Sequence, residues 1–193
     1  MPKTFDLERA RRGIEEFLRG LGHDPSLEPE LARTAERVVE AWTTDLLAGE
    51  DIDVKRVLRE GSTPANTGER GVVVLRNLAA IAVCPHHLMP AVGSATVLYI
   101  PGDRIAGLGT VAKLVDAFSR RLVLQEEIGD HVAQALVNHL GARGALCRLS
   151  MMHTCLVARG ERKHEARIDS LCLAGSLTQP GPDRELAMAE LHP

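Results

Sequence analysis

The stretch Cys84-Pro85-His86-His87 places one thiol and two imidazoles within four consecutive residues. Cysteine thiolates and histidine nitrogens are the preferred zinc ligands in proteins. The Cys-x-x-His spacing lets Cys84 and His87 reach one ion from a single tight turn, with His86 pointing elsewhere. Buried cysteines and hydrogen-bonded core histidines are also common, so this stretch alone leaves both a metal site and ordinary packing open.

A second pair of the same residue types lies downstream, at His153-Thr154-Cys155. The run around it is apolar and strand-like, and alternation along a strand puts His153 and Cys155 on one side. Cys84, His87 and Cys155 then make three zinc ligands. Catalytic zinc sites keep three protein ligands and leave the fourth position to water, whereas structural sites use four. Two further histidines beside such a site indicate hydrolysis with proton transfer.

Composition narrows the class of protein. The chain has 193 residues, 45% of them hydrophobic, which is enough for a real core. A net charge of −3 gives no general attraction to nucleic acid or anionic lipid. The N-terminus lacks an apolar signal core and no run has the length of a membrane span, so we expect a cytoplasmic protein. The four cysteines favour metal ligands plus two buried thiols, Cys147 and Cys172, over a disulfide framework.

Hydrophobic periodicity predicts the order of elements. Helices are expected over residues 5–21, from about 27–29 to 47, and over 52–58, followed by a polar loop over 61–68. Strands are then expected over 71–76, 79–83 and 92–100, helices over 108–122 and 124–140, strands over 145–152, 154–158 and 168–177, and a final helix over 183–191.

This order has no regular strand-helix alternation and no internal repeat. It predicts an α+β fold in which an antiparallel sheet carries a helix pair on one face. We divide the chain into an N-terminal helical segment, residues 1–60, and a zinc-binding catalytic domain, residues 61–193. No dinucleotide-binding, P-loop or nucleophile-elbow motif is present.

Several separated motifs together resemble type I GTP cyclohydrolase over roughly residues 37–177. They are Cys84-Pro85-His86-His87-Leu88, Tyr99-Ile100-Pro101, Gly107-Leu108, Arg120-Arg121, Gln125-Glu126, His153-Thr154-Cys155 and Arg159-Gly160. The resemblance implies the tunnelling fold, whose subunits pair their sheets into a barrel. It also implies a toroidal homodecamer with its sites at subunit boundaries.

The same resemblance implies a mechanism. The residues matching Cys84, His87 and Cys155 hold zinc, and a zinc-bound water attacks C8 of the guanine ring of GTP. His153 would protonate the ring nitrogen, and His86 would assist ribose opening or later proton transfers. Formate and 7,8-dihydroneopterin triphosphate are the implied products, in the biosynthesis of folate or tetrahydrobiopterin. Cys/His ligation suits zinc, although iron or cobalt can take the same geometry.

Substrate recognition is also implied by the resemblance. Gln125 and Glu126 match residues that recognise the guanine edge, where a carboxylate can accept from N1–H and the exocyclic amine. Without the resemblance, Glu126 would be interpreted as a solvated charge at a helix start. Arg159 matches a phosphate-binding arginine, and Lys113 and Arg37 supply further positive charge for the triphosphate.

Other positions depart from the family pattern. Pro85 stands where the family usually has glutamate, Gly109-Thr110 replaces Ser-Lys, Glu40 replaces a basic residue, and the usual Ser and Thr are missing near residues 166–168. These changes keep two alternatives open. One is a divergent family member acting on a less phosphorylated guanine compound or another purine-like ring. The other is a non-catalytic assembly or regulatory protein that retains zinc for structure.

Overall fold

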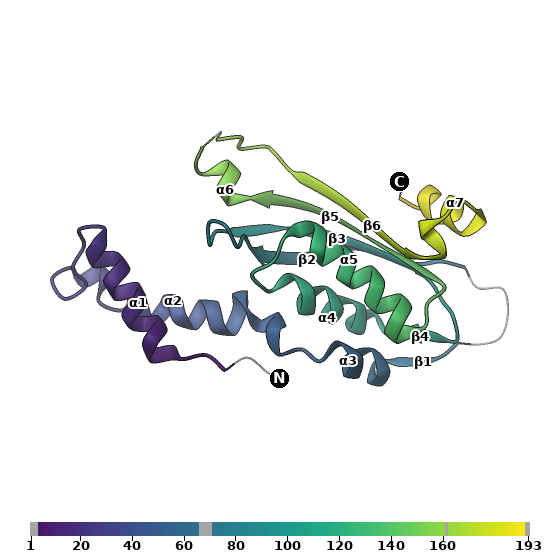
Figure 1. The fold of residues 1–193 in the computed structure, drawn as a ribbon, viewed down its shortest axis with the longest axis horizontal. Helices are drawn as coiled ribbons and strands as arrows, with labels where there is room; N and C mark the ends of the chain where they lie inside the picture. Colours follow the sequence, from purple (N-terminus) through teal and green to yellow (C-terminus); the bar gives the residue numbers. More distant parts are fainter. Residues whose placement is uncertain (1–3, 66–70, 161, 192–193) are drawn as a thin grey trace.

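The computed structural model describes residues 4–65, 71–160 and 162–191. A four-stranded antiparallel sheet forms its centre, and two helices cover one face of that sheet (Figure 1). The strands, in spatial order, are β2 (Val73–Val83), β3 (Pro90–Ile100), β5 (Gly144–His153) and β6 (Ile168–Gly175). The covering helices are α4 (Leu108–Ser119) and α5 (Gln125–Ala135). The predicted α+β class with a helix pair on one face is confirmed, and the arrangement is consistent with a tunnelling-type fold.

The first helix, α1 (Leu7–Gly20), projects away from the sheet together with the helix after it (Figure 1). Asp6 caps its start, because its carboxylate accepts from the Arg9 N–H at 2.9 Å. The helix has no buried residue, and Phe17 is 63% exposed. Its apolar face is therefore only partly covered, by α2 (Thr34–Ala41).

The second predicted helix is broken into three pieces. These are a 3-10 turn (Pro29–Leu31), α2 (Thr34–Ala41) and a π-helical turn (Trp42–Leu46). The hydroxyls of Thr43 and Thr44 donate back to the carbonyl oxygens of Val39 and Glu40, at 2.8 and 2.9 Å. Side-chain bonds of this kind compete with the helical backbone pattern and accompany such irregular turns.

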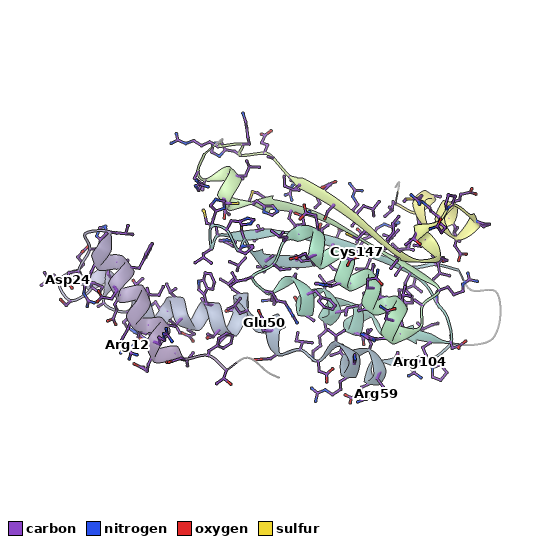
Figure 2. All side chains as sticks on the ribbon, viewed as in Figure 1. Arg12, Asp24, Glu50, Arg59, Arg104 and Cys147 are labelled. Atoms are coloured by element: carbon purple, nitrogen blue, oxygen red, sulfur yellow. The ribbon has the colours of Figure 1, made fainter. Side chains whose placement is uncertain are left out.

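The third predicted helix is α3 (Val54–Glu60), which Asp53 caps by accepting from the Arg56 N–H at 3.0 Å. Part of the polar loop expected over residues 61–68 is instead a short strand, β1 (Ser62–Pro64), paired with β4 (Arg104–Ala106). Residues 66–70 lie outside the described part of the chain. Arg59 and Arg104 lie side by side at this end of the molecule, and Arg104 also donates to the Ser62 hydroxyl at 2.8 Å (Figure 2).

Two strands predicted as separate are one. β2 continues through a bulge between Leu75 and Leu78, where Asn77 takes the left-handed conformation, φ 58°. Asparagine tolerates this conformation better than most non-glycine residues. A bulge adds a residue to one strand without ending the pairing, so the alternation is interrupted while the strand is not.

The main core lies between the sheet and the helix pair. Val111, Leu114, Ile128 and Val132 of the two helices are fully buried there, and each such side chain contributes about 1.5 to 3 kcal/mol through burial. Cys147 is also fully buried, on β5 at the middle of the sheet (Figure 2). Burial raises the pKa of the Cys147 thiol to about 12, so this cysteine belongs to the core as predicted.

The chain ends on the opposite face of the sheet. The last helix, α7 (Pro182–Ala189), helps to cover one end of that face through a smaller apolar cluster. Leu98, Ile100, Leu146, Leu177 and Ala187 form that cluster. Toward the other end, Val92 and Leu171 remain 38% and 43% exposed. Within the described residues, no helix has the length and apolar character needed to cross a bilayer.

Candidate metal centre and pocket

The turn after β2 holds the first two candidate ligands. Leu88 N–H donates to the Cys84 carbonyl oxygen, and Cys84 N–H donates to the Met89 carbonyl oxygen, each at 2.9 Å. Leu88 takes the left-handed conformation, φ 54°. Pro85 suits the second position of this turn, because its ring fixes φ in the range the turn requires. The departure at Pro85 is thus compatible with the shape of the turn.

This turn brings the thiol and both imidazoles together. The Cys84 Sγ lies 3.6 Å from the His87 Nδ1 and 4.0 Å from the His86 Nδ1. Sulfur and nitrogen ligands at about 2.3 and 2.0–2.1 Å from a tetrahedral zinc ion are themselves about 3.6 Å apart. The spacing of Cys84 and His87 therefore fits such an ion directly.

Cys155 completes the cluster, although by a different route from the one predicted. The strand expected over residues 154–158 is instead a short helix, α6 (Thr154–Val157). β5 ends at His153, which pairs with Ala91 of β3, and the Thr154 hydroxyl donates to the Pro90 carbonyl oxygen at 2.6 Å. These contacts anchor the start of α6 beside the turn after β2.

The ligand atoms of Cys84, His87 and Cys155 all lie within 4.8 Å of one another. Burial, and next the neighbouring Cys84 thiol, raise the pKa of the Cys155 thiol. A divalent cation reverses this effect, since it deprotonates a coordinating thiol outright. Two thiols and one imidazole at this spacing fit a metal ion with one position left for a further ligand.

A pocket of about 280 Å³ opens beside the cluster. Its size is near the lower end of the range for small-molecule sites. Much of its lining is apolar, but the polar groups that converge on it are those singled out in the sequence. They are Cys84, His86, His87, Gln125, Glu126, His153 and Cys155.

The first turn of α5 separates the roles of two adjacent carboxylates. Glu127 caps the helix, because its carboxylate accepts from the Leu124 N–H at 3.1 Å. Glu126 lines the pocket instead. Glu127 therefore serves the helix, and Glu126 is left to face the pocket.

Gln125 lines the pocket, although it is only 3% exposed. Its Oε1 lies 2.8 Å from the His153 Nε2, and its Nε2 lies 2.8 Å from the Ile168 carbonyl oxygen. Burial lowers the pKa of His153, and the charge of Glu126 offsets part of that shift. No sequence motif marks these anchors, because backbone carbonyl groups occur at every residue.

Comparisons with known proteins identify the family of this chain. The sequence model of the GTP cyclohydrolase I family matches residues 10–192. GTP cyclohydrolase 1 of Ralstonia nicotianae is 36% identical over 177 residues, 92% of this chain and 83% of that protein. The enzyme of Leifsonia xyli is 35% identical over 182 residues, 94% of each chain. The chain belongs to the GTP cyclohydrolase I family.

Two further likenesses complete the comparison. GTP cyclohydrolase 1 of Chromobacterium violaceum is 37% identical over 175 residues, 90% of this chain and 82% of that protein. A solved structure of the archaeosine synthase QueF-Like in the apo form matches with a TM-score of 0.47 at 16% identity. That structure is matched over 98% of its length and 56% of this chain.

The basic residues that resemble phosphate ligands of the GTP cyclohydrolase I family lie outside this pocket. Arg37, Lys113 and Arg159 are exposed, and none of them is among the described residues that line it. The charge of Arg159 acts to lower the pKa of the Cys155 thiol, against the larger effect of burial. Lys113 belongs to α4, and Arg37 belongs to α2, which projects from the sheet (Figure 1). One copy of the chain does not bring all of the family's expected groups together.

Thr110, which stands where the GTP cyclohydrolase I family usually has lysine, lies near the opposite end of the sheet. It is held beside Gly61, next to β1, whereas the metal cluster follows the last residue of β2. β2 has 11 residues, and a strand of that length spans about 35 Å. Glu40 lies neither beside Thr110 nor in the pocket of the metal cluster, but in the cleft between α1 and α2.

Proposed function

We propose that this protein is a GTP cyclohydrolase I, which opens the imidazole ring of GTP at C8, releases formate and forms 7,8-dihydroneopterin triphosphate. One observation supports this most directly: the Cys84, His87 and Cys155 cluster shares a pocket with Glu126 and His153. A structural metal site needs neither of the last two residues. The family assigns the reaction to the biosynthesis of pterins, including folate.

Zinc is the ion that we propose for the Cys84, His87 and Cys155 site, on the basis of two thiols and one imidazole whose ligand atoms lie within 4.8 Å of one another. A zinc ion held there supplies Lewis-acid activation of water near neutral pH. The apolar walls of the pocket, which include Ala82 and Met151, exclude bulk water and strengthen electrostatic interactions inside it.

Glu126 is proposed to recognise the guanine edge. Its carboxylate lines the pocket from the first turn of α5, and an ionised carboxylate only accepts hydrogen bonds. Guanine presents two donors side by side, N1–H and the exocyclic amine, so one carboxylate satisfies both. A base without those donors would leave the carboxylate unpaired in the pocket, which costs binding energy.

His153 and His86 are proposed to move protons. His153 lines the pocket at the end of β5, where it can deliver a proton to the ring nitrogen on which charge develops. His86 lies in the turn after β2, with its Nδ1 4.0 Å from the Cys84 Sγ. From there it can assist ribose opening and the later proton transfers. Imidazoles suit both tasks because their ordinary pKa lies near the operating pH.

The triphosphate is proposed to meet Arg159, Lys113 and Arg37, with different copies of the chain contributing at one subunit boundary. Two observations support an assembly, a homodecamer by family resemblance. The basic groups are dispersed over one chain, and α1, which packs only against α2 among the larger contacts of the described residues, has no buried residue. Open sheet edges are a further surface for neighbouring copies. In this arrangement residues 61–193 form the catalytic domain, and residues 1–60 form a helical segment used in assembly.

A second candidate function is favoured by Thr110. Its hydroxyl donates to the Gly61 carbonyl oxygen at 2.9 Å, so its only side-chain donor is used within the fold. With Glu40 also in place of a basic residue, two charge-assisted phosphate contacts are absent. The loss of two such contacts lowers triphosphate affinity by on the order of a hundredfold or more. A less phosphorylated guanine compound is the substrate that this favours.

The deciding experiment measures formate release by the purified, zinc-loaded protein with GTP, GMP and guanosine in parallel, followed by pterin fluorescence after oxidation. Formate and fluorescence with GTP support the cyclohydrolase. Turnover of GMP or guanosine with silence on GTP would support the second candidate. Silence on all three substrates, with loss of the oligomer when the metal is removed, would point to a non-catalytic zinc protein.

The role of the cluster is tested separately with Cys155→Ser. We expect loss of bound zinc, measured by elemental analysis, and loss of formate release. His139→Gln is the matched control, because His139 is exposed near the end of the helix pair, away from the pocket. Retention of both zinc and full turnover by Cys155→Ser would overturn the assignment.

A further inference from the structure

The orientation of the Gln125 side-chain amide is determined by the sheet behind it. Its Nε2 lies 2.8 Å from the Ile168 carbonyl oxygen and 3.4 Å from the Leu149 carbonyl oxygen, and it also lies 3.1 Å from the Ser170 hydroxyl. Carbonyl oxygens only accept hydrogen bonds. A flipped amide would place its own oxygen against both of them, so the nitrogen must face the sheet.

The opposite atom of this amide faces His153. Gln125 Oε1 lies 2.8 Å from His153 Nε2, and an amide oxygen is an acceptor only. The hydrogen of this bond therefore belongs to His153 Nε2. An imidazole has two nitrogens, and Nδ1 is the one that remains to exchange a proton with a molecule in the pocket.

We propose that Gln125 is a positioning residue, which holds the hydrogen of His153 on Nε2 and leaves Nδ1 as the atom that transfers protons. The proposal rests on the proposed function of the pocket, and it specifies through which atom His153 acts. Gln125 and Glu126 both line the pocket, but the Gln125 amide is already engaged on both sides, its Nε2 by the sheet and its Oε1 by His153.

The close approach of α5 to the sheet makes this arrangement possible. Gly129, one turn after Gln125, is buried, and a Cβ there would lie 2.9 Å from the Cys172 Sγ. A larger residue would force Cys172 or the helix to shift. The close approach of α5 brings the amide of Gln125 within reach of the carbonyl groups of β5 and β6. The sheet thus orients the amide, and the amide orients the imidazole that ends β5.

The first test measures the tautomer directly and needs no turnover. Protein labelled with 15N-histidine and loaded with zinc is studied by magic-angle-spinning NMR at pH 8, above the ordinary histidine pKa of about 6.5. The His153 signals are identified by their absence in His153→Gln. We expect the hydrogen on Nε2 and a bare Nδ1. A hydrogen on Nδ1 would overturn the proposal, whether or not the protein turns over GTP.

The second test uses Gln125→Met, which keeps the length of the side chain and removes both amide groups. We expect kcat for GTP to fall by about tenfold to a hundredfold, because the imidazole is no longer held in place, while KM changes by less than about threefold. The partial variant Gln125→Asn should keep more of kcat. Gln134→Met is the control, since Gln134 is exposed on the same helix.

Two kinetic results would overturn the positioning role. One is an unchanged kcat in Gln125→Met, and the other is a rise in KM alone, as expected of a residue that binds the base. If Gln125→Met does not fold, the kinetics of Gln125→Asn and the NMR measurement on the unaltered protein still test the positioning role of Gln125. If the unaltered protein has no turnover, the proposed function fails, and the tautomer is still settled by NMR.

Discussion

Thr110 donates its side-chain hydroxyl to the carbonyl oxygen of Gly61 at 2.9 Å, which ties the first turn of α4 to the end of α3. The same carbonyl oxygen also accepts from the Gly107 N–H at 2.9 Å. Thr110 therefore has a structural role at a position where the family usually has lysine.

Replacing Thr110 by valine keeps the shape of the side chain and removes its donor. We expect the free energy of unfolding to fall by about 1 kcal/mol, the usual net contribution of one hydrogen bond, because Gly61 keeps its bond from Gly107. Urea unfolding measures the change. Thr63→Val, at an exposed position of β1, should change stability by less than about 0.5 kcal/mol. Equal losses in both variants would contradict a specific role for Thr110.

The same position tests the preference for phosphorylation state. Thr110→Lys restores the residue that the family usually carries, and we expect a lower KM for GTP with little change for guanosine, because the added charge meets only the triphosphate. Because Thr110 lies far from the metal cluster of its own chain, the lysine would reach the triphosphate bound to a neighbouring copy. Steady-state kinetics on both substrates measure this effect. An unchanged KM for GTP would count against Thr110 as a specificity position.

Two adjacent glutamates of α5 should respond differently to the same substitution. Glu126→Gln should lower kcat/KM for GTP by about 10- to 100-fold, because a charge-assisted pair of hydrogen bonds to the guanine edge is lost. Glu127→Gln should leave kcat/KM nearly unchanged and lower stability by up to about 1 kcal/mol, since it weakens the helix cap. If kinetics and urea unfolding give the reverse pattern, the assignment of these two roles is wrong.

Gly129 and Gly109 offer a matched pair for helix packing. A Cβ at Gly129 would lie 2.9 Å from the Cys172 Sγ and 3.3 Å from its Cβ, whereas a Cβ at Gly109 would meet nothing within 4 Å. Gly129→Ala should therefore destabilise the protein by about 1 to 3 kcal/mol through overpacking. Gly109→Ala should be neutral or stabilise it by up to about 1 kcal/mol through helix propensity. Urea unfolding of both variants decides, and a stable Gly129→Ala would show that α5 can move.

A cross-strand ion pair gives a prediction for pH. The Arg148 guanidinium lies 2.6 Å from the Asp169 carboxylate, and its hydrogen bond lowers the pKa of that carboxyl below the ordinary value of 3.8. The resulting stabilisation is present above pH 3.8 and is lost as the pH falls through the lowered pKa. Both side chains are nearly half exposed, so it amounts to less than about 1 kcal/mol.

Asp169→Asn should accordingly be less stable than the unaltered protein at pH 7. Below about pH 4 the difference between their free energies of unfolding should shrink toward zero. The comparison requires unfolding curves of the two proteins at matched pH values. A difference that stayed constant down to pH 3 would mean that the ion pair is not its cause.

The sequence by itself determined the elements and groups whose causes are local. The start of α1 is set by Asp6, the first helical segment stops at Gly22 (φ 89°), and α5 with its final turn stops at Gly141 (φ 79°), because caps and left-handed glycines act over a few residues. Cys84 and His87 were likewise identifiable, since one turn carries both. The family followed from several such motifs in order.

Only the tertiary structure decided how distant segments meet. It placed Cys155 on a helix rather than a strand, joined two predicted strands through the bulge at Asn77, and paired β1 with β4. It also engaged the Gln125 amide between His153 and the backbone carbonyls of β5 and β6. The physical reason is common to all of these: their partners are backbone groups or residues far away in sequence, and neither leaves a local pattern of residue types.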